Sequence, residues 1–155
     1  MTRFGKNNQT PRRLAGLLLA LLGLVAWQLS GAQTDPMAIQ LGDLPWGEPG
    51  GGNGVPLGTR TAQMGIDPET GGVTYYALFP AGTHFDLHWH THDEFVVVIQ
   101  GTVTIELGDD THTLTPGAYV VIPGKLRHSW DIPETGDVII LVRRAGPADF
   151  HFVGR

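Results

Sequence analysis

Residues 82–101 read GTHFDLHWHTHDEFVVVIQG, and the spacing within this stretch decides the fold and the chemistry. His88 and His90 stand two positions apart, so on a β-strand both imidazoles point to the same face. Glu94 follows four residues later and opens the strongly β-prone run EFVVVIQ. Because adjacent strands lie about 5 Å apart, the carboxylate of Glu94 can reach an ion that the two rings hold.

The rest of the chain predicts an all-β fold. Short runs rich in β-branched and aromatic residues alternate with Gly- and Pro-containing turns, and no stretch after residue 33 keeps a 3.6-residue apolar period. Short strands at this spacing are typical of a sandwich or a barrel. We expect strands at residues 73–79, 94–100, 102–107, 111–114, 118–122, 129–131, 137–143 and 149–153.

His128 is a fourth candidate ligand, because it follows a Pro-Gly turn from which a neighbouring strand can reach the same ion. Three imidazoles and one carboxylate form an N/O ligand set that suits one divalent transition metal, such as Fe, Mn, Ni, Cu or Zn, and leaves open positions for a substrate. Taken alone, an HxH pair is a weak signal, and hydrogen-bonded or exposed histidines are the alternative. The predicted metal ligands are His88, His90, Glu94 and His128.

These two segments resemble the two sequence motifs of the cupin superfamily. Residues 82–101 agree with G-x5-H-x-H-x3/4-E-x6-G at every fixed position, and residues 117–128 resemble G-x5-P-x-G-x2-H. Lys125 stands where the family has Gly, and Ile132 stands where it often has Asn. A Gly in that turn adopts a positive φ at little cost, so we expect Gly124 to take over this role. The resemblance implies a single-domain double-stranded β-helix, the jelly-roll cupin barrel.

The resemblance also implies a function. The ligand set is similar to that of quercetin-type and acireductone-type dioxygenases and of germin-like oxidases, which implies an oxygenase- or oxidase-type enzyme acting on a small chelating organic substrate. In such an enzyme Glu94 is the candidate catalytic residue, as the base for an enolic or phenolic proton. A redox-neutral metal enzyme (isomerase, cyclase or decarboxylase) and a non-catalytic periplasmic metal- or ligand-binding sensor are the alternatives. Small cupins often pair, so we expect a homodimer formed through residues 59–66.

Strand parity predicts further positions around the site. Trp130 shares a strand face with His128, so we expect it in the wall of a pocket. Val96 and Val98 share a strand face with Glu94, so we expect them at the floor of that pocket. His84 and Asp86 stand at even-numbered positions like His88, so an unbroken strand would place all three side chains on one face. Isolated polar residues of strands are usually solvated, so we expect both at the surface.

The first 32 residues have the features of a secretory signal peptide. Four basic residues precede an apolar run over residues 14–27, the segment has no acidic residue, and Ser30-Gly31-Ala32 precedes the expected cleavage point. An uncleaved anchor is the alternative, although the run is short for a membrane span of about 20 residues. Arg12-Arg13 keeps twin-arginine export open beside the general secretory route. We expect an exported protein, periplasmic or extracellular, with a Gly/Pro-rich flexible arm at residues 33–58 and a β-barrel domain at residues 59–155.

Composition limits the classes of partner and of chemistry. Without the signal peptide, six basic residues face fifteen acidic ones, a net charge of about −9. Such a domain is unsuited to nucleic acids and to anionic membrane surfaces, which leaves a small-molecule substrate or ligand. The chain has no Cys and only two Ser residues. Thiol nucleophiles, thiolate metal sites and Ser-based hydrolysis are therefore excluded or nearly so.

Overall fold

The computed structural model describes Met1 and residues 36–154. Apart from Met1, the predicted signal peptide lies outside the described residues, as do its cleavage point and the anchor alternative. In the part of the chain that is described, no helix has the length and apolar character that a membrane crossing requires. The described residues 36–154 belong to one compact unit.

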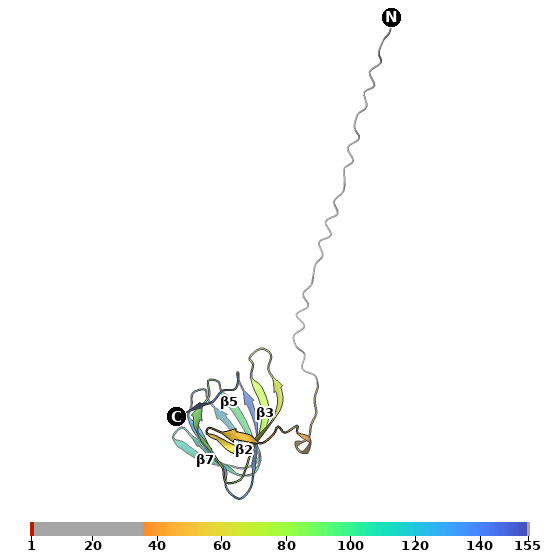
Figure 1. Cartoon of the computed structure of the whole chain (residues 1–155). Helices are drawn as coiled ribbons and strands as arrows, with labels where there is room; N and C mark the ends of the chain where they lie inside the picture. Colours follow the sequence, from red (N-terminus) through yellow and green to blue (C-terminus); the bar gives the residue numbers. More distant parts are fainter. Residues whose placement is uncertain (2–35, 155) are drawn as a thin grey trace. The chain divides into compact units, whose positions relative to one another are not determined.

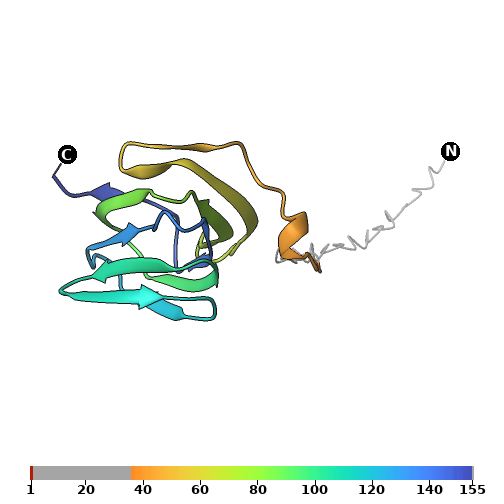
Figure 2. The same ribbon diagram turned by 90° about the horizontal axis from the view of Figure 1, so that it is seen from below.

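This unit consists of strands in two antiparallel sheets (Figure 1). The six-stranded sheet has the order β1-β2-β3-β10-β5-β8, and the five-stranded sheet has the order β11-β4-β9-β6-β7, which can be followed across Figure 2. The prediction of an all-β jelly-roll fold is confirmed. The elements are the 3-10 helix η1 (Leu41–Asp43) and the strands β1 (Gly50–Gly52), β2 (Val55–Ile66), β3 (Val73–Phe79), β4 (His84–Trp89), β5 (Glu94–Gln100), β6 (Val103–Leu107), β7 (Asp110–Leu114), β8 (Tyr119–Ile122), β9 (His128–Asp131), β10 (Val138–Arg144) and β11 (His151–Phe152).

The hydrophobic core lies between the two sheets. In β5 and β6 every second side chain is buried, and Val96, Val98, Val103 and Ile105 are all fully buried. This is the period-2 alternation of a strand with one face against the core. Burial of each aliphatic side chain contributes about 1.5–3 kcal/mol, so these strands give the segments that carry the predicted ligands a rigid support.

Strand β4 departs from this alternation. Phe85 and His88 are both buried although they stand three positions apart, and the pairing of β4 with β9 shifts register between them. The extra residue forms a β-bulge, which re-aims the side chains on either side of it. The predicted common face of His84, Asp86 and His88 is therefore wrong, because the bulge turns Phe85 inward instead. His84 is exposed, as expected, and Asp86 is half-buried.

The predicted boundary at residue 58 falls inside a strand. The Gly-rich segment, expected to be a loop or a flexible arm, contains β1 and the first residues of β2, which pair as a hairpin. Its turn uses positive φ angles, 97° at Gly52, 52° at Asn53 and 97° at Gly54, which glycine adopts readily. Residues 60–66 of β2 pair with β3 of the same chain. They lie in the segment expected to mediate dimerisation, and the homodimer stays a prediction.

The turn before His128 accommodates Lys125 in an unexpected way. Lys125 itself takes the positive φ, 69°, so the expectation that Gly124 would do so is wrong. The Lys125 N–H donates to the carbonyl of His90 at 2.7 Å. Gly124 is required for a different reason, since a Cβ there would lie 2.7 Å from the carbonyl oxygen of Thr91. This turn therefore ties the residues before His128 to the segment that carries His90.

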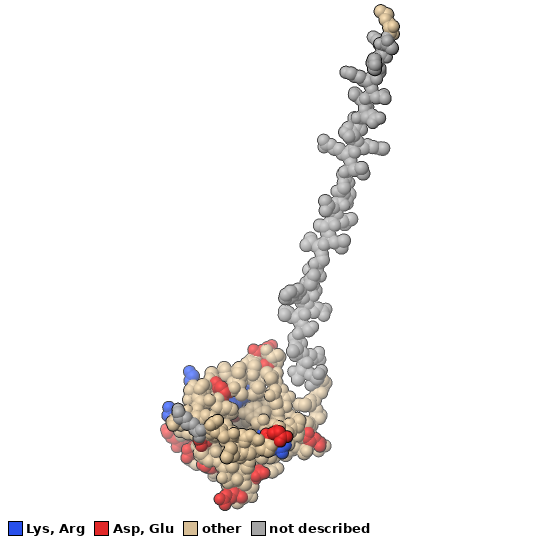
Figure 3. Space-filling model, viewed as in Figure 1, with Lys and Arg blue, Asp and Glu red and all other residues tan. Residues whose placement is uncertain are grey.

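The surface agrees with an acidic domain. On the face drawn in Figure 3, acidic side chains are spread widely and basic ones are fewer, without forming a patch there. The exclusion of nucleic-acid partners rests on this charge and stays a prediction.

Candidate metal centre and pocket

Three buried histidines converge between β4 and β9. His88 lies in β4, His90 directly follows that strand, and His128 opens β9. The antiparallel register places His88 directly opposite His128. Their exposed fractions are 1%, 3% and 0%, and one nitrogen from each lies within 4.8 Å of those of the other two. The fold thus brings together residues that lie up to 40 positions apart in the chain.

Backbone carbonyls fix the orientation of all three rings. The Nδ1 atoms of His88, His90 and His128 donate to the carbonyls of Asp86, Asp149 and Leu126, at 2.6, 2.6 and 3.1 Å. A carbonyl only accepts, so each Nδ1 carries a hydrogen, and in a neutral ring Nε2 then presents a lone pair. Metal-binding histidines are usually oriented in this way.

Glu94 lies beside two of these nitrogens. It opens β5 and is 5% exposed. Its Oε2 lies 3.0 Å from Nε2 of His90 and 3.8 Å from Nε2 of His128. The structure therefore brings all four predicted ligands together, although coordination by Glu94 stays a prediction.

The donor set fits a cation. Neither Nε2 of His90 nor Nε2 of His128 has a hydrogen-bond partner among the described residues, although both are buried. Lone pairs that face a carboxylate repel one another unless a proton or a cation lies between them, and buried polar atoms without partners are costly. A divalent ion that accepts from the imidazoles and the carboxylate satisfies these atoms together. The nitrogen and oxygen ligands suit the transition metals named above.

The protonation states also favour metal binding. Burial, together with the neighbouring His128, lowers the pKa of His88 to about 3, and burial lowers the pKa of His128 to about 4. Burial alone would raise the pKa of Glu94, but the adjacent His90 and the charge of Arg144 outweigh it and hold this pKa below its usual value. At neutral pH the site therefore offers neutral imidazoles of His88 and His128 and an ionised carboxylate, which are the forms that bind metals.

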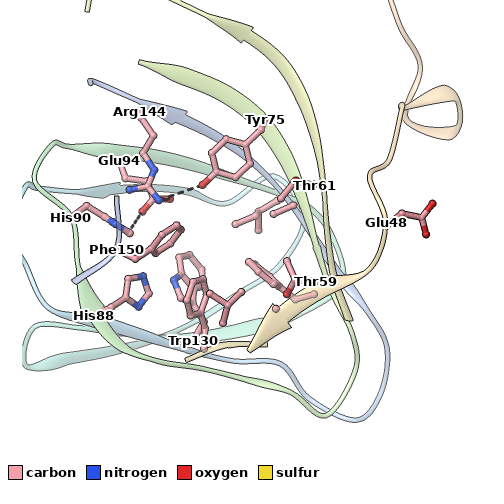
Figure 4. Close-up of a pocket in the computed structure, with 17 residues that line it drawn as sticks. Glu48, Thr59, Thr61, Tyr75, His88, His90, Glu94, Trp130, Arg144 and Phe150 are labelled. Carbon is pink, nitrogen blue, oxygen red and sulfur yellow. Dashed lines mark hydrogen bonds and ion pairs between the residues drawn. The ribbon is translucent and has the colours of Figure 1, made fainter. Parts of the chain in front are cut away.

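A pocket of about 280 Å³ adjoins these residues (Figure 4). Trp130 lines it, as predicted. Val96 and Val98 are buried in the core but are not among the lining residues, so their prediction as the pocket floor is wrong. The apolar walls come from aromatic and aliphatic side chains, among them Phe79, Phe85, Trp130, Ile140 and Phe150. Such a mixture of apolar walls with a few polar groups is typical of small-molecule sites.

Several polar residues of this pocket were not predicted (Glu48, Thr59, Thr61, Tyr75 and Arg144), and among them Arg144 contacts both Glu94 and Tyr75. Arg144 is 2% exposed and lies directly opposite Glu94 in the register of β10 and β5. Its Nη2 lies 3.4 Å from Oε1 of Glu94 and 3.3 Å from the hydroxyl of Tyr75. Burial and the nearby Glu94 raise the pKa of Tyr75 to about 12, so its phenol is neutral. The sequence contained a signal for this arginine. Consecutive strand residues point to opposite faces of a sheet, so one member of the pair Arg143-Arg144 has to point inward if the strand reaches that far.

His84, His112 and His151 are not part of the group formed by the three buried histidines. His84 is exposed, and its Nδ1 lies 2.6 Å from the carboxylate of Asp131. His112 is exposed on β7. The ring of His151 stacks on that of Trp89, with 3.9 Å between the ring centroids.

Comparisons with known proteins support this description. A family model described as "Cupin domain" matches residues 75–143, which include all four predicted ligands. No curated protein matches the chain significantly. The polyketide cyclase RemF from Streptomyces resistomycificus has a similar structure, with a TM-score of 0.60, 18% identity and coverage of 78% of this chain and 87% of that one.

Two further solved structures share the fold. The cupin-2 domain protein Rru_A2000 from Rhodospirillum rubrum has a TM-score of 0.54 and 19% identity over 61% of this chain, and the match spans 64% of that chain. A structure of the DMSP lyases RdDddP and RnDddQII has a TM-score of 0.54 and 16% identity over 61% of this chain and 52% of that one. The two jelly-roll sheets, both sequence motifs and the matching family model together identify residues 75–143 of this chain as a cupin domain.

Proposed function

We propose that this protein binds one divalent transition metal through His88, His90, Glu94 and His128 and uses it as an oxygenase- or oxidase-type enzyme on a small chelating organic substrate. The observation that carries the proposal is the pair of buried Nε2 atoms, of His90 and His128, that find no hydrogen-bond partner within the described part of the chain and face a carboxylate at the wall of a pocket. A redox-active ion bound there supplies electron transfer between a chelated substrate and dioxygen.

The residues of the chain then have distinct roles. The backbone carbonyls hold the imidazole lone pairs in place, so little reorganisation is needed on metal binding. The aromatic walls limit access of water and provide an apolar surface for the carbon skeleton of a ligand. Glu94 is ionised, and if its carboxylate leaves the metal it can accept a proton from an enol or phenol as that oxygen approaches.

Oxygen consumption tests the catalytic part of this proposal. The protein is loaded separately with Fe, Mn, Ni, Cu and Zn, and oxygen uptake is followed with a panel of chelating enols and phenols, including flavonols and acireductone-like enediols. We expect uptake with at least one redox-active metal, none with Zn, and a loss of at least 100-fold in the Glu94→Gln variant at full metal occupancy. The matched control is Glu106→Gln, on β6, where the carboxylate accepts a hydrogen bond from Ser129.

The outcome also separates the oxygen-using reaction from its alternatives. Turnover of a substrate without oxygen uptake, equally fast with Zn, would contradict the oxygenase assignment and point to Lewis-acid chemistry. The similar structures include a polyketide cyclase and DMSP lyases, whose names suggest reactions other than oxygenation. Metal binding without turnover of any substrate would favour a binding or sensing module.

A further inference from the structure

A buried arginine forms part of the pocket beside the metal centre. Arg144, the last residue of β10, is 2% exposed and lines the pocket together with Glu94 and Tyr75. Arginine is almost never fully buried unless its charge is paired. Figure 4 shows Arg144 and Tyr75 on the same side of the pocket, with the tyrosine hydroxyl near the guanidinium group.

The contacts of Arg144 leave hydrogen-bonding capacity unused. Both polar contacts of Nη2, at 3.3 Å to Tyr75 and 3.4 Å to Glu94, are long for charge-assisted hydrogen bonds, which are typically about 2.7–2.9 Å. The Nε atom has no hydrogen-bond partner among the described residues. The ring of Phe150 lies 5.2 Å from the guanidinium carbon, and this contact stabilises the cation without using its N–H groups. The guanidinium is therefore held in place with donors available for a further acceptor.

The charge of the pocket favours an anionic acceptor. If the proposed divalent ion is bound, the ion and Arg144 carry three positive charges in the buried part of the pocket, where Glu94 supplies one negative charge. The other acidic residue of the lining, Glu48, is exposed to solvent. Unbalanced positive charge in a buried site is unfavourable, so a ligand that brings a negative oxygen is stabilised. This step rests on the proposed function, whereas the unused donors of Arg144 do not.

We propose that Arg144 and Tyr75 form the specificity element of this pocket and bind the carboxylate of a small aromatic acid. Arginine offers several N–H donors in a planar fork that matches a carboxylate, and the hydroxyl of Tyr75 lies beside this fork to donate another hydrogen bond. The aromatic side chains Phe79, Phe85, Trp130 and Phe150 line the same pocket and suit a ring. Its volume of about 280 Å³ favours a ligand with a single ring.

Isothermal titration with benzoate and benzamide tests the inference, because the two probes have nearly the same shape and differ in charge. The whole protein is titrated in its metal-free and its metal-loaded forms. We expect benzoate to bind at least tenfold more tightly than benzamide in both forms. The Arg144→Gln variant should lose this preference, and Tyr75→Phe should weaken benzoate binding about three- to tenfold, with metal content unchanged in both variants.

Arg143→Gln is the matched control, because it removes the same charge one residue away, on the exposed face of β10. It should bind benzoate as the unmodified protein does. Tyr75→Phe removes only a hydroxyl, so it keeps the test decisive if Arg144→Gln does not fold. Equal affinities for the two probes, no benzoate binding at millimolar concentration, or a benzoate preference that survives both substitutions would overturn the inference. Failure of the proposed function gives a different result, namely no bound metal or no turnover, while the metal-free titration still decides the role of Arg144.

Discussion

The ring of His90 is oriented by a residue 59 positions away, because its Nδ1 donates to the backbone carbonyl of Asp149 at 2.6 Å. The carboxylate of Asp149 in turn accepts hydrogen bonds from the N–H and the hydroxyl of Thr91, the residue next to His90. Two independent contacts thus connect the segment before β11 to the end of β4. The carbonyl that orients the ring is fixed by the side chain of the same residue.

Asp149→Ala should therefore weaken metal binding without removing a ligand. Loss of the carboxylate contacts to Thr91 frees the carbonyl that orients His90, and loss of such outer contacts typically costs 10- to 100-fold in metal affinity. Competition with a chromophoric chelator measures the change. Asp131→Asn is the control, since its partner His84 is exposed and away from the site. An unchanged affinity in Asp149→Ala would show that the orientation of His90 does not depend on this carboxylate.

The metal-free protein should lose stability as the pH falls from 6.5 to 5. The pKa values of His88 and His128 are about 3 and about 4 in the folded protein, below the 6.5 of an unfolded chain. In this pH window the unfolded state binds more protons, so the free energy of unfolding decreases with falling pH, by up to about 1.4 kcal/mol per pH unit for each histidine.

Urea unfolding at several pH values in the presence of chelator measures this dependence. The variant His128→Gln should have about half the slope, because one of the two depressed histidines is absent. His112→Gln, at an exposed position of β7, should keep the full slope. A flat profile between pH 6.5 and 5 would contradict the assignment of buried neutral imidazoles.

Lys125→Gly should stabilise the protein by about 1 kcal/mol. Lys125 has a φ of 69°, a conformation that costs a residue with a Cβ roughly 1–2 kcal/mol and glycine much less. The neighbouring substitution Gly124→Ala should destabilise it, since the new Cβ would lie 2.7 Å from the carbonyl oxygen of Thr91. Urea unfolding of the two variants checks both signs, and a destabilised Lys125→Gly would mean that the lysine side chain has a stabilising role in this turn.

We also propose that the chain is exported and cleaved after Ala32. The basic residues, apolar run and small residues of positions 1–32 motivate this proposal. Mass spectrometry of the protein recovered from periplasmic and medium fractions of its host should give a first residue of Gln33. Recovery of the full-length chain in the membrane fraction would instead support the anchor.

Much of the metal centre could be predicted from the sequence because it depends on local spacing. His88, His90 and Glu94 belong to one motif, and strand parity together with a short turn is enough to place them near one another. The turn that ends at His128 supplied the fourth residue. Alternation in β5 and β6 likewise follows from the period-2 pattern, which sequence reading detects well.

The remaining features depend on register and on irregular backbone. The bulge in β4 cannot be read from parity, so the inward position of Phe85 was missed. Arg144 reaches the pocket because β10 pairs with β5 in the register that places it opposite Glu94, and pairing between strands this far apart in sequence is not encoded locally. Strand β1 and the first residues of β2 were hidden by a composition typical of loops, since the positive φ angles of their hairpin turn favour glycine.

Elemental analysis of the mature protein tests the central claim most directly. The protein is purified from its own host without chelator or added metal, beside the double variant His88→Ala, His128→Ala and the control His84→Ala, His112→Ala. We expect near-stoichiometric Fe, Mn, Ni, Cu or Zn in the unmodified protein and the control, and less than a tenth of that amount in the double variant. Absence of metal from the unmodified protein, with none taken up on titration, would contradict the account and leave a metal-free binding barrel.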